Sequence, residues 1–197
     1  MIGRFCAPTF SRMKKRLFGT ALGAWTTSIL LSFAGPAAAV DGISFEAGSG
    51  SVSTDAWRAG LQWRWDRRWF EDRAWSLGGY WELQLGQWSA PAGTIADVSL
   101  APVFRLEPSR SPGQASGHSY YIEAAIGFHL LSGRRVSSRR KFSTRFQFGD
   151  HVGVGVRFGE RRRHDLGVRL QHLSNANIDT PNPGINFVLL RYQLHLD

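Results

Sequence analysis

Apolar and polar side chains alternate along much of this 197-residue chain. The alternation is clearest over residues 57–66, 75–86, 120–130 and 146–158. A period of two residues is typical of a β-strand with one apolar face, and no helical period of 3.6 residues competes over these stretches. The sequence therefore predicts an all-β protein.

Weaker alternating segments raise the number of expected strands to eight. Most are about ten residues long, the length that a tilted strand needs to cross the hydrocarbon layer of a membrane. An even number of antiparallel strands can close into a barrel with both chain ends on one side. We predict an eight-stranded antiparallel transmembrane β-barrel with strands at 43–50, 57–66, 74–87, 94–106, 119–130, 145–158, 165–174 and 186–196.

The first 39 residues have the order of a secretory signal peptide. Basic residues between Arg4 and Arg16 come first, an apolar stretch from Leu17 to Phe33 follows, and the small residues end at Ala39. A single membrane anchor is the alternative, but the stretch is short and holds several Gly, Thr and Ser residues. We expect cleavage after Ala39, which leaves residues 40–197 as one outer-membrane β-barrel.

Loss of this segment changes the charge and the cysteine content. Five of the 24 Lys and Arg residues lie in it, so 19 remain against 15 Asp and Glu, and the net charge falls from +9 to +4. This modest charge in an exported chain argues against nucleic acid as a partner. Cys6 is lost as well, and no metal, phosphate or cofactor motif is present. We expect no metal and no cofactor.

Charged residues follow the polar face of every expected strand. A soluble β-sandwich or a lipocalin-like barrel would also alternate. However, eight strands enclose only enough room for packed side chains, so these charges can pair inside the barrel. Tryptophans near strand ends on the opposite face are typical of an interfacial girdle and favour a membrane barrel. They are Trp57, Trp63, Trp65, Trp75, Trp81 and Trp88.

On the seventh expected strand, the side chains that point outward are apolar except for the last two, His172 and Ser174. With a periplasmic N-terminus they lie near the external end, where contact of polar groups with lipid is costly. They share one face across about 6.6 Å of strand rise, a gap that an imidazole can bend across. This is the nucleophile–base pair that acyl transfer needs. Alternatively, both simply lie in the polar headgroup zone. Asn186 opens the next strand on the same face.

The segment 172–186, which reads HLSNANIDTPNPGIN, closely resembles the signature of the PagL family, the outer-membrane lipid A 3-O-deacylases. Residues 146–155 also resemble that family's sixth strand. The resemblance implies that Ser174 attacks an acyl ester, that His172 is its base, and that Asn175 helps to hold the oxyanion. It implies lipopolysaccharide as the substrate, with lipid A reaching the site from the outer leaflet of a bacterial outer membrane.

The chain departs from the family pattern at the third catalytic position, where Asn186 stands in place of a Glu. A neutral amide can fix the imidazole tautomer but cannot stabilise the imidazolium by charge. Three readings stay open: Asn186 suffices, Asp179 supplies the carboxylate, or the enzyme is slow or inactive.

A basic segment occupies the expected external loop 131–144. Arginine matches phosphate oxygens, so its basic residues are candidates for contact with lipid A phosphates, with ordinary surface charge as the alternative. They are Arg134, Arg135, Arg139, Arg140 and Lys141.

Asp150 is a charged residue among the outward-facing apolar side chains of the sixth expected strand. It indicates either an oligomer contact, such as a homodimer, or the boundary between the apolar and polar zones of the membrane.

Two other functions fit the same pattern. A non-enzymatic barrel of the OmpA or OmpX kind would be indifferent to changes at His172 and Ser174. A palmitoyl transferase or phospholipase on a similar barrel would differ from a lipid A deacylase in its product.

Overall fold

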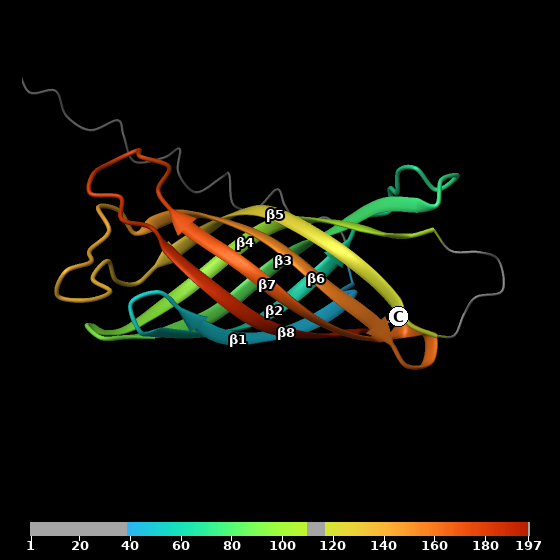
Figure 1. The fold of residues 1–197 in the computed structure, drawn as a ribbon, viewed down its shortest axis with the longest axis horizontal. Coiled ribbons are helices and arrows are strands. Elements are labelled where there is room, and N and C mark those ends of the chain that lie inside the picture. Colours follow the sequence, from blue (N-terminus) through green and yellow to red (C-terminus); the bar gives the residue numbers. More distant parts are fainter. Residues whose placement is uncertain (1–38, 110–116, 197) are drawn as a thin grey trace, which may run out of the picture. The chain divides into compact units, whose positions relative to one another are not determined.

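The described residues of the computed structural model, 39–109 and 117–196, form a closed antiparallel β-barrel (Figure 1). Each strand pairs with the next, and β1 pairs with β8, so no strand edge stays open. The strands are β1 (Gly42–Gly50), β2 (Thr54–Arg64), β3 (Trp75–Ala90), β4 (Gly93–Pro108), β5 (Ser119–Leu131), β6 (Phe146–Phe158), β7 (His164–Ser174) and β8 (Ile185–His195). The predicted eight-stranded antiparallel barrel is confirmed.

The expected signal peptide, 1–39, lies outside the described residues except for Ala39. Among the described residues, the helical structure is the 3-10 turn η1 (Glu160–Arg162). No helix in this part of the chain has the length and hydropathy to cross a membrane.

The first and last described residues meet at one end of the barrel, where the Leu196 amide donates to the Asp41 carbonyl. We call the opposite end the distal end. It carries the connecting segments 51–53, 91–92, 132–145 and 175–184, the third of which corresponds to the expected external loop 131–144. The first two are several residues shorter than the predicted strand bounds imply, because β2 begins at Thr54 and β3 continues to Ala90.

Ion pairs fill the lumen. Arg169 on β7 contacts the carboxylates of Glu46, Glu82 and Glu123 at 3.0, 2.8 and 2.7 Å. Arg58 on β2 extends the network from Glu46 to Asp97, at 2.8 Å each. Removing a charge from water is costly, so each member depends on its partners being in place.

The same network continues toward the end where Leu196 meets Asp41, which we call the proximal end. Arg191 on β8 bonds Glu82 at 2.8 Å, while Arg105 on β4 bonds Glu123 at 2.8 Å and Asp165 at 2.6 Å. Its members therefore lie on seven of the eight strands. Because successive residues point to opposite faces, a slip of one residue in any of these strands would move its charges to the outer wall.

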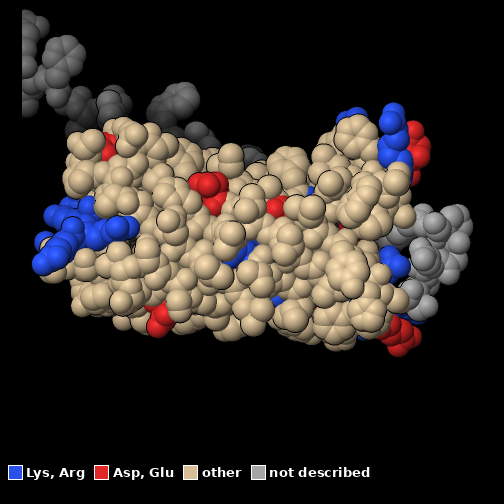
Figure 2. All heavy atoms as spheres, in the orientation of Figure 1, with Lys and Arg blue, Asp and Glu red and all other residues tan. Residues whose placement is uncertain are grey.

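The outer wall is largely uncharged (Figure 2). Its exposed side chains come from the apolar files of the strands, among them Phe45, Leu85, Leu100, Ile122, Ile126, Val152, Leu170 and Leu190. Such an apolar wall around a charged lumen is the reverse of a water-soluble protein and is typical of an outer-membrane barrel.

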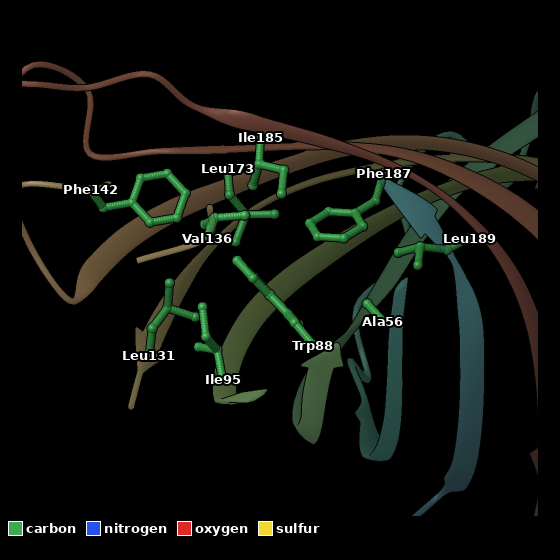
Figure 3. Packing of buried hydrophobic residues seen from close by; sticks show 10 residues of the cluster. All are labelled: Ala56, Trp88, Ile95, Leu131, Val136, Phe142, Leu173, Ile185, Phe187 and Leu189. Carbon is green, nitrogen blue, oxygen red and sulfur yellow. The ribbon is translucent and has the colours of Figure 1, made fainter. Parts of the chain in front are cut away.

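A compact apolar cluster closes the lumen at the distal end (Figure 3). Trp88 packs in its middle, with ring centroids 5.1 Å from Phe187 and 6.5 Å from Phe142. Val136 and Phe142 come from the segment 132–145, so that loop folds back into the barrel mouth. Two further members, Leu173 and Ile185, are chain neighbours of the candidate site residues.

The assignment of Trp88 to the outer girdle is wrong. Its side chain is fully buried, and its indole Nε1 donates to Asp97 Oδ2 at 3.1 Å. The reason is the length of β3: the strand runs past residue 87, so its alternation carries Trp88 to the lumen face. Trp57, Trp75 and Trp81 are exposed on the outer wall, as expected.

Replacing Arg169 with leucine should lower the free energy of unfolding by about 3–5 kcal/mol, because three buried carboxylates lose their shared cation. Urea unfolding in detergent micelles, followed by tryptophan fluorescence, measures this loss. Arg73→Leu is the control: Arg73 is largely exposed, 3.7 Å from Asp72, and its loss should matter little. Equal losses in the two variants would contradict a role for the lumen network in stability.

Candidate active site

His172 and Ser174 lie on the outer face at the distal end of β7. Their neighbour Leu173 is fully buried in the apolar cluster, and strand alternation directs His172 and Ser174 the opposite way. Asn186 is the cross-strand partner of His172 on β8, with Ile185 buried beside it. The structure therefore brings the three sequence-predicted residues to one patch of the wall.

A hydrogen bond joins His172 to Asn186. Nδ1 of the imidazole lies 2.6 Å from Oδ1 of the amide. An amide oxygen can only accept, so Nδ1 carries the proton and donates it. In the neutral ring, Nε2 is then the unprotonated nitrogen, which is the form that a general base requires.

Ser174 makes no hydrogen bond to His172 among the described contacts. The two side chains are two residues apart on β7, so a bond between them requires the ring to turn along the strand. Catalytic hydrogen bonds are often longer without substrate than in the reacting complex. The arrangement therefore brings a hydroxyl and an imidazole to one face of the barrel, without a hydrogen bond between them among the described contacts.

Gly184 borders the imidazole on the distal side. A Cβ at this position would lie 2.7 Å from Cε1 of His172 and 3.2 Å from Nε2, and the backbone φ is +58°. The lack of space for a side chain and the positive φ both require glycine at position 184. Arg140 Nη1 donates to the Gly184 carbonyl at 2.6 Å and so ties the segment 132–145 to this turn.

Asn175 organises the segment 175–184. Its buried Nδ2 donates to Ser143 Oγ at 2.7 Å and to the Asp179 carbonyl at 2.8 Å, while its Oδ1 accepts from the Asn177 amide at 3.0 Å. Its own backbone amide donates to Asn182 Oδ1 at 3.0 Å. A role in holding an oxyanion stays a prediction, and it would require one of the two Nδ2 contacts to be exchanged.

Asp179 lies away from the imidazole contacts. Its Oδ1 accepts from the Thr180 amide at 2.8 Å, and it forms no hydrogen bond or ion pair with His172 among the described residues. The contact that orients His172 therefore comes from Asn186.

The basic residues of the segment 132–145 gather at the distal end (Figure 2). Arg134, Arg135, Arg139 and Lys141 are exposed, and Arg134 bonds the Ser143 carbonyl at 2.5 Å. Arg140 is partly buried and bonded to Gly184. Contact of this group with phosphate stays a prediction, and Arg140 has a structural contact in addition.

Sequence reasoning missed the relation of Asp150 to this site. Asp150 on β6 is the cross-strand partner of His172, on the side opposite Asn186. The alternation of side chains placed Asp150 on the outer wall. However, alternation does not tell how far along the barrel axis a residue of one strand lies relative to residues of the next strand. Only the pairing register of β6 with β7 could have shown that the two residues are neighbours.

A concavity in the outer wall adjoins the imidazole. Its lining includes Asp150, His172 and Asn186 together with apolar side chains of β5 to β8, among them Ile126, Val152, Leu170 and Val188. Within residues 39–109 and 117–196, no group of three or more His, Cys, Asp and Glu side chains is placed to hold a metal ion.

The profile of a family described as lipid A 3-O-deacylase (PagL) matches residues 55–195. A protein named lipid A deacylase PagL from Pseudomonas aeruginosa is 32% identical over 157 residues, which covers 77% of this chain and 84% of that protein. One of the same name from Bordetella bronchiseptica is 36% identical over 115 residues, 56% of this chain and 58% of that protein. This chain thus spans a little over half of the Bordetella protein.

A crystal structure described as the outer membrane enzyme PagL has a similar fold. The TM-score is 0.70 at 30% sequence identity, and the alignment covers 79% of this chain and 99% of the other. The similarity therefore extends over the whole barrel and is not confined to the motif around Ser174.

Gly184→Ala should separate His172 from Asn186, because the added methyl group occupies the space of the imidazole. Nitrogen NMR of the histidine side chains distinguishes protonated from unprotonated ring nitrogens. The wild type should show His172 with the proton on Nδ1, and the variant a mixture of tautomers. Gly133→Ala is the control, since its methyl group would meet only Ile95, at 3.5 Å. An unchanged His172 signal in Gly184→Ala would contradict this account.

Proposed function

The chain belongs to the PagL family of lipid A 3-O-deacylases, and from this premise we propose that it hydrolyses an ester-linked 3-hydroxyacyl chain of lipid A with Ser174 as the nucleophile. The observation that carries the proposal is the His172–Asn186 hydrogen bond of 2.6 Å on the face that also bears Ser174. It leaves Nε2 of His172 free to accept a proton.

The reaction requires two acyl transfers. Ser174 Oγ bonds to the acyl carbonyl carbon while its proton passes to Nε2 of His172 and the carbonyl π electrons move to oxygen. Collapse of this intermediate breaks the bond to the sugar oxygen, which takes the proton from His172 and leaves as a hydroxyl. Water, with its proton taken by His172, then attacks the carbonyl carbon of the acyl-serine. Collapse breaks the bond to Ser174 Oγ, which takes that proton back from His172, and the free hydroxy acid is released.

The outer wall explains how such a substrate would arrive. The barrel presents apolar side chains around the site, so it lies in the outer membrane with this face toward lipid. With the distal end outside the cell, the site meets the outer leaflet, where lipid A resides. The ester can then reach Ser174 laterally while its acyl chain stays in hydrocarbon, along Val152, Leu170 and Val188.

Two further groups would contact the substrate. Asn175 lies next to Ser174 and is a candidate donor to the oxyanion, for which one such donor is worth about 3–4 kcal/mol of the barrier. The basic residues Arg134, Arg135, Arg139 and Lys141 are exposed at the distal end, and with that end outside the cell they would lie near the headgroups and could bond the lipid A phosphates. A non-enzymatic barrel would need neither an oxyanion donor beside Ser174 nor a group of basic residues for phosphate.

Cells that express the wild type should contain lipid A that has lost one 3-hydroxyacyl chain, whereas cells that express Ser174→Ala or His172→Ala should contain intact lipid A. Mass spectrometry of extracted lipid A measures the change. The rate should fall at least about 1,000-fold in either variant, because the nucleophile and its base act as a unit.

Ser89→Ala and His164→Ala are matched controls. Ser89 is exposed near the distal end of β3, and His164 lies at the proximal end of β7 beside Tyr192. Both should leave the deacylation unchanged. Intact lipid A with every variant, including the wild type, would leave only a structural barrel of the OmpA or OmpX kind.

The amide of Asn186 should matter through its accepting oxygen. Asn186→Ala removes the acceptor that fixes the Nδ1–H tautomer, and kcat should fall by about 100-fold. Asn186→Glu keeps an acceptor and adds a charge beside the imidazole, so kcat should rise, by up to about tenfold. Steady-state assays on purified lipid A in detergent measure both, and a loss of activity in Asn186→Glu would contradict the assignment.

A further inference from the structure

Asp150 is an exposed carboxylate on the apolar wall of the barrel. It lies on the outer face of β6, and the next outward residue of this strand is Val152. Its carboxylate forms no hydrogen bond or ion pair with any described residue. An isolated charge in contact with hydrocarbon costs free energy, so a carboxylate at this place requires a compensating role.

Asp150, His172 and Asn186 form a row across three adjacent strands. His172 on β7 pairs directly with Asp150 on β6 and with Asn186 on β8. Directly opposed side chains of an antiparallel pair have their Cβ atoms about 4.5–5.5 Å apart. All three also line the same concavity of the outer wall. The imidazole therefore stands between a carboxylate and an amide.

The two neighbours can serve His172 in different ways. Asn186 accepts the Nδ1 proton and so fixes the ring and its tautomer, but it carries no charge. Asp150 brings a carboxylate to the neighbouring strand, directly opposite His172, and Coulomb attraction between charges is stronger in a medium of low polarity than in water. Around the ring, β8 contributes no charged side chain, and the segment 132–145 contributes Arg140 through its bond to Gly184.

We propose that Asp150 supplies the negative charge that stabilises the His172 imidazolium, a role that Asn186 cannot fill. The inference deepens the proposed function and rests on it. Asn186 orients the base and Asp150 compensates its positive charge, two tasks that a single carboxylate at position 186 would perform together. Asp150 is thus a positioning residue that acts through His172 and touches neither the ester nor Ser174.

The charge matters in one step. When Ser174 Oγ bonds to the acyl carbon, its proton moves to Nε2 of His172 and the carbonyl oxygen takes the electron pair. The ring becomes positive for as long as the tetrahedral intermediate lasts, and Asp150 exchanges no proton in this step. Because the benefit exists only when the ring is charged, its loss should lower kcat and leave KM nearly unchanged.

The test uses the full-length protein purified from membranes and two measurements. One is the steady-state release of the hydroxy acid from lipid A. The other is the rate at which a fluorophosphonate probe labels Ser174, which depends on the base but not on lipid A. Asp150→Asn should lower both kcat and the labelling rate by about 10- to 100-fold, with KM within twofold of the wild type.

Three further variants separate the charge from the shape. Asp150→Glu should keep most of the activity. Adding Asn186→Glu to Asp150→Asn should restore kcat and labelling to the wild-type level, because a charge then reaches His172 from β8. Asp55→Asn makes the same change at an exposed residue near the distal end of β2 and should stay within twofold of the wild type.

The proposal is overturned if Asp150→Asn keeps wild-type kcat and labelling, or if Asn186→Glu fails to restore them. It is also overturned if wild-type Ser174 does not react with the probe. Labelling of wild-type Ser174 without any release from lipid A would instead refute the proposed substrate. The labelling series would then still decide whether Asp150 supports the base.

Discussion

The ion pairs of the lumen are the constraint on which the other features of this barrel depend. Arg169 alone contacts carboxylates from β1, β3 and β5, and the network reaches β2, β4 and β8 through its other members. Because buried charges tolerate no loss of a partner, the network permits one register for each of these strands. That register decides which side chains face outward, and therefore that His172 and Ser174 leave the lumen.

The apolar cluster at the distal end adds a second constraint, because it fixes the position of the ends of β7 and β8 along the barrel and the shape of the turn between them. Leu173 and Ile185 are anchored inside it, directly beside the residues of the site. The segments 132–145 and 175–184 are joined by the contacts of Asn175 with Ser143 and of Arg140 with Gly184. Side chains on the outside of a barrel have protein packed on one side only, so their rigidity has to come mainly from the packing behind the strand and from the turn above it.

The proposed serine mechanism on a lipid-facing wall poses an electrostatic problem. The base would become positive during the reaction, with little water nearby to solvate that charge, and a permanent counter-charge on the wall is itself costly. In the proposal, a carboxylate one strand away and a neutral amide in direct contact would divide these two tasks between two residues. The division would allow an asparagine at position 186 without loss of the chemistry.

The sequence by itself determined the class of fold and the residues of the motif. Alternation identifies strands from local order, because side chains point to opposite faces whatever the partner strand is. The same rule placed His172, Ser174 and Asn186 on the outer wall and failed at Trp88, where the end of β3 was set too early. Strand ends depend on pairing with β4, which local pattern does not contain.

Only the tertiary structure decided which residues are neighbours. The contact of His172 with Asn186, the position of Asp150 on its other side and the closeness of Gly184 to the ring all depend on register between strands and on loop packing. The inward and outward directions of side chains repeat every second residue along a strand. This pattern alone therefore does not determine how far one strand is shifted along the next. The buried ion pairs and the apolar cluster set that shift, and with it the site.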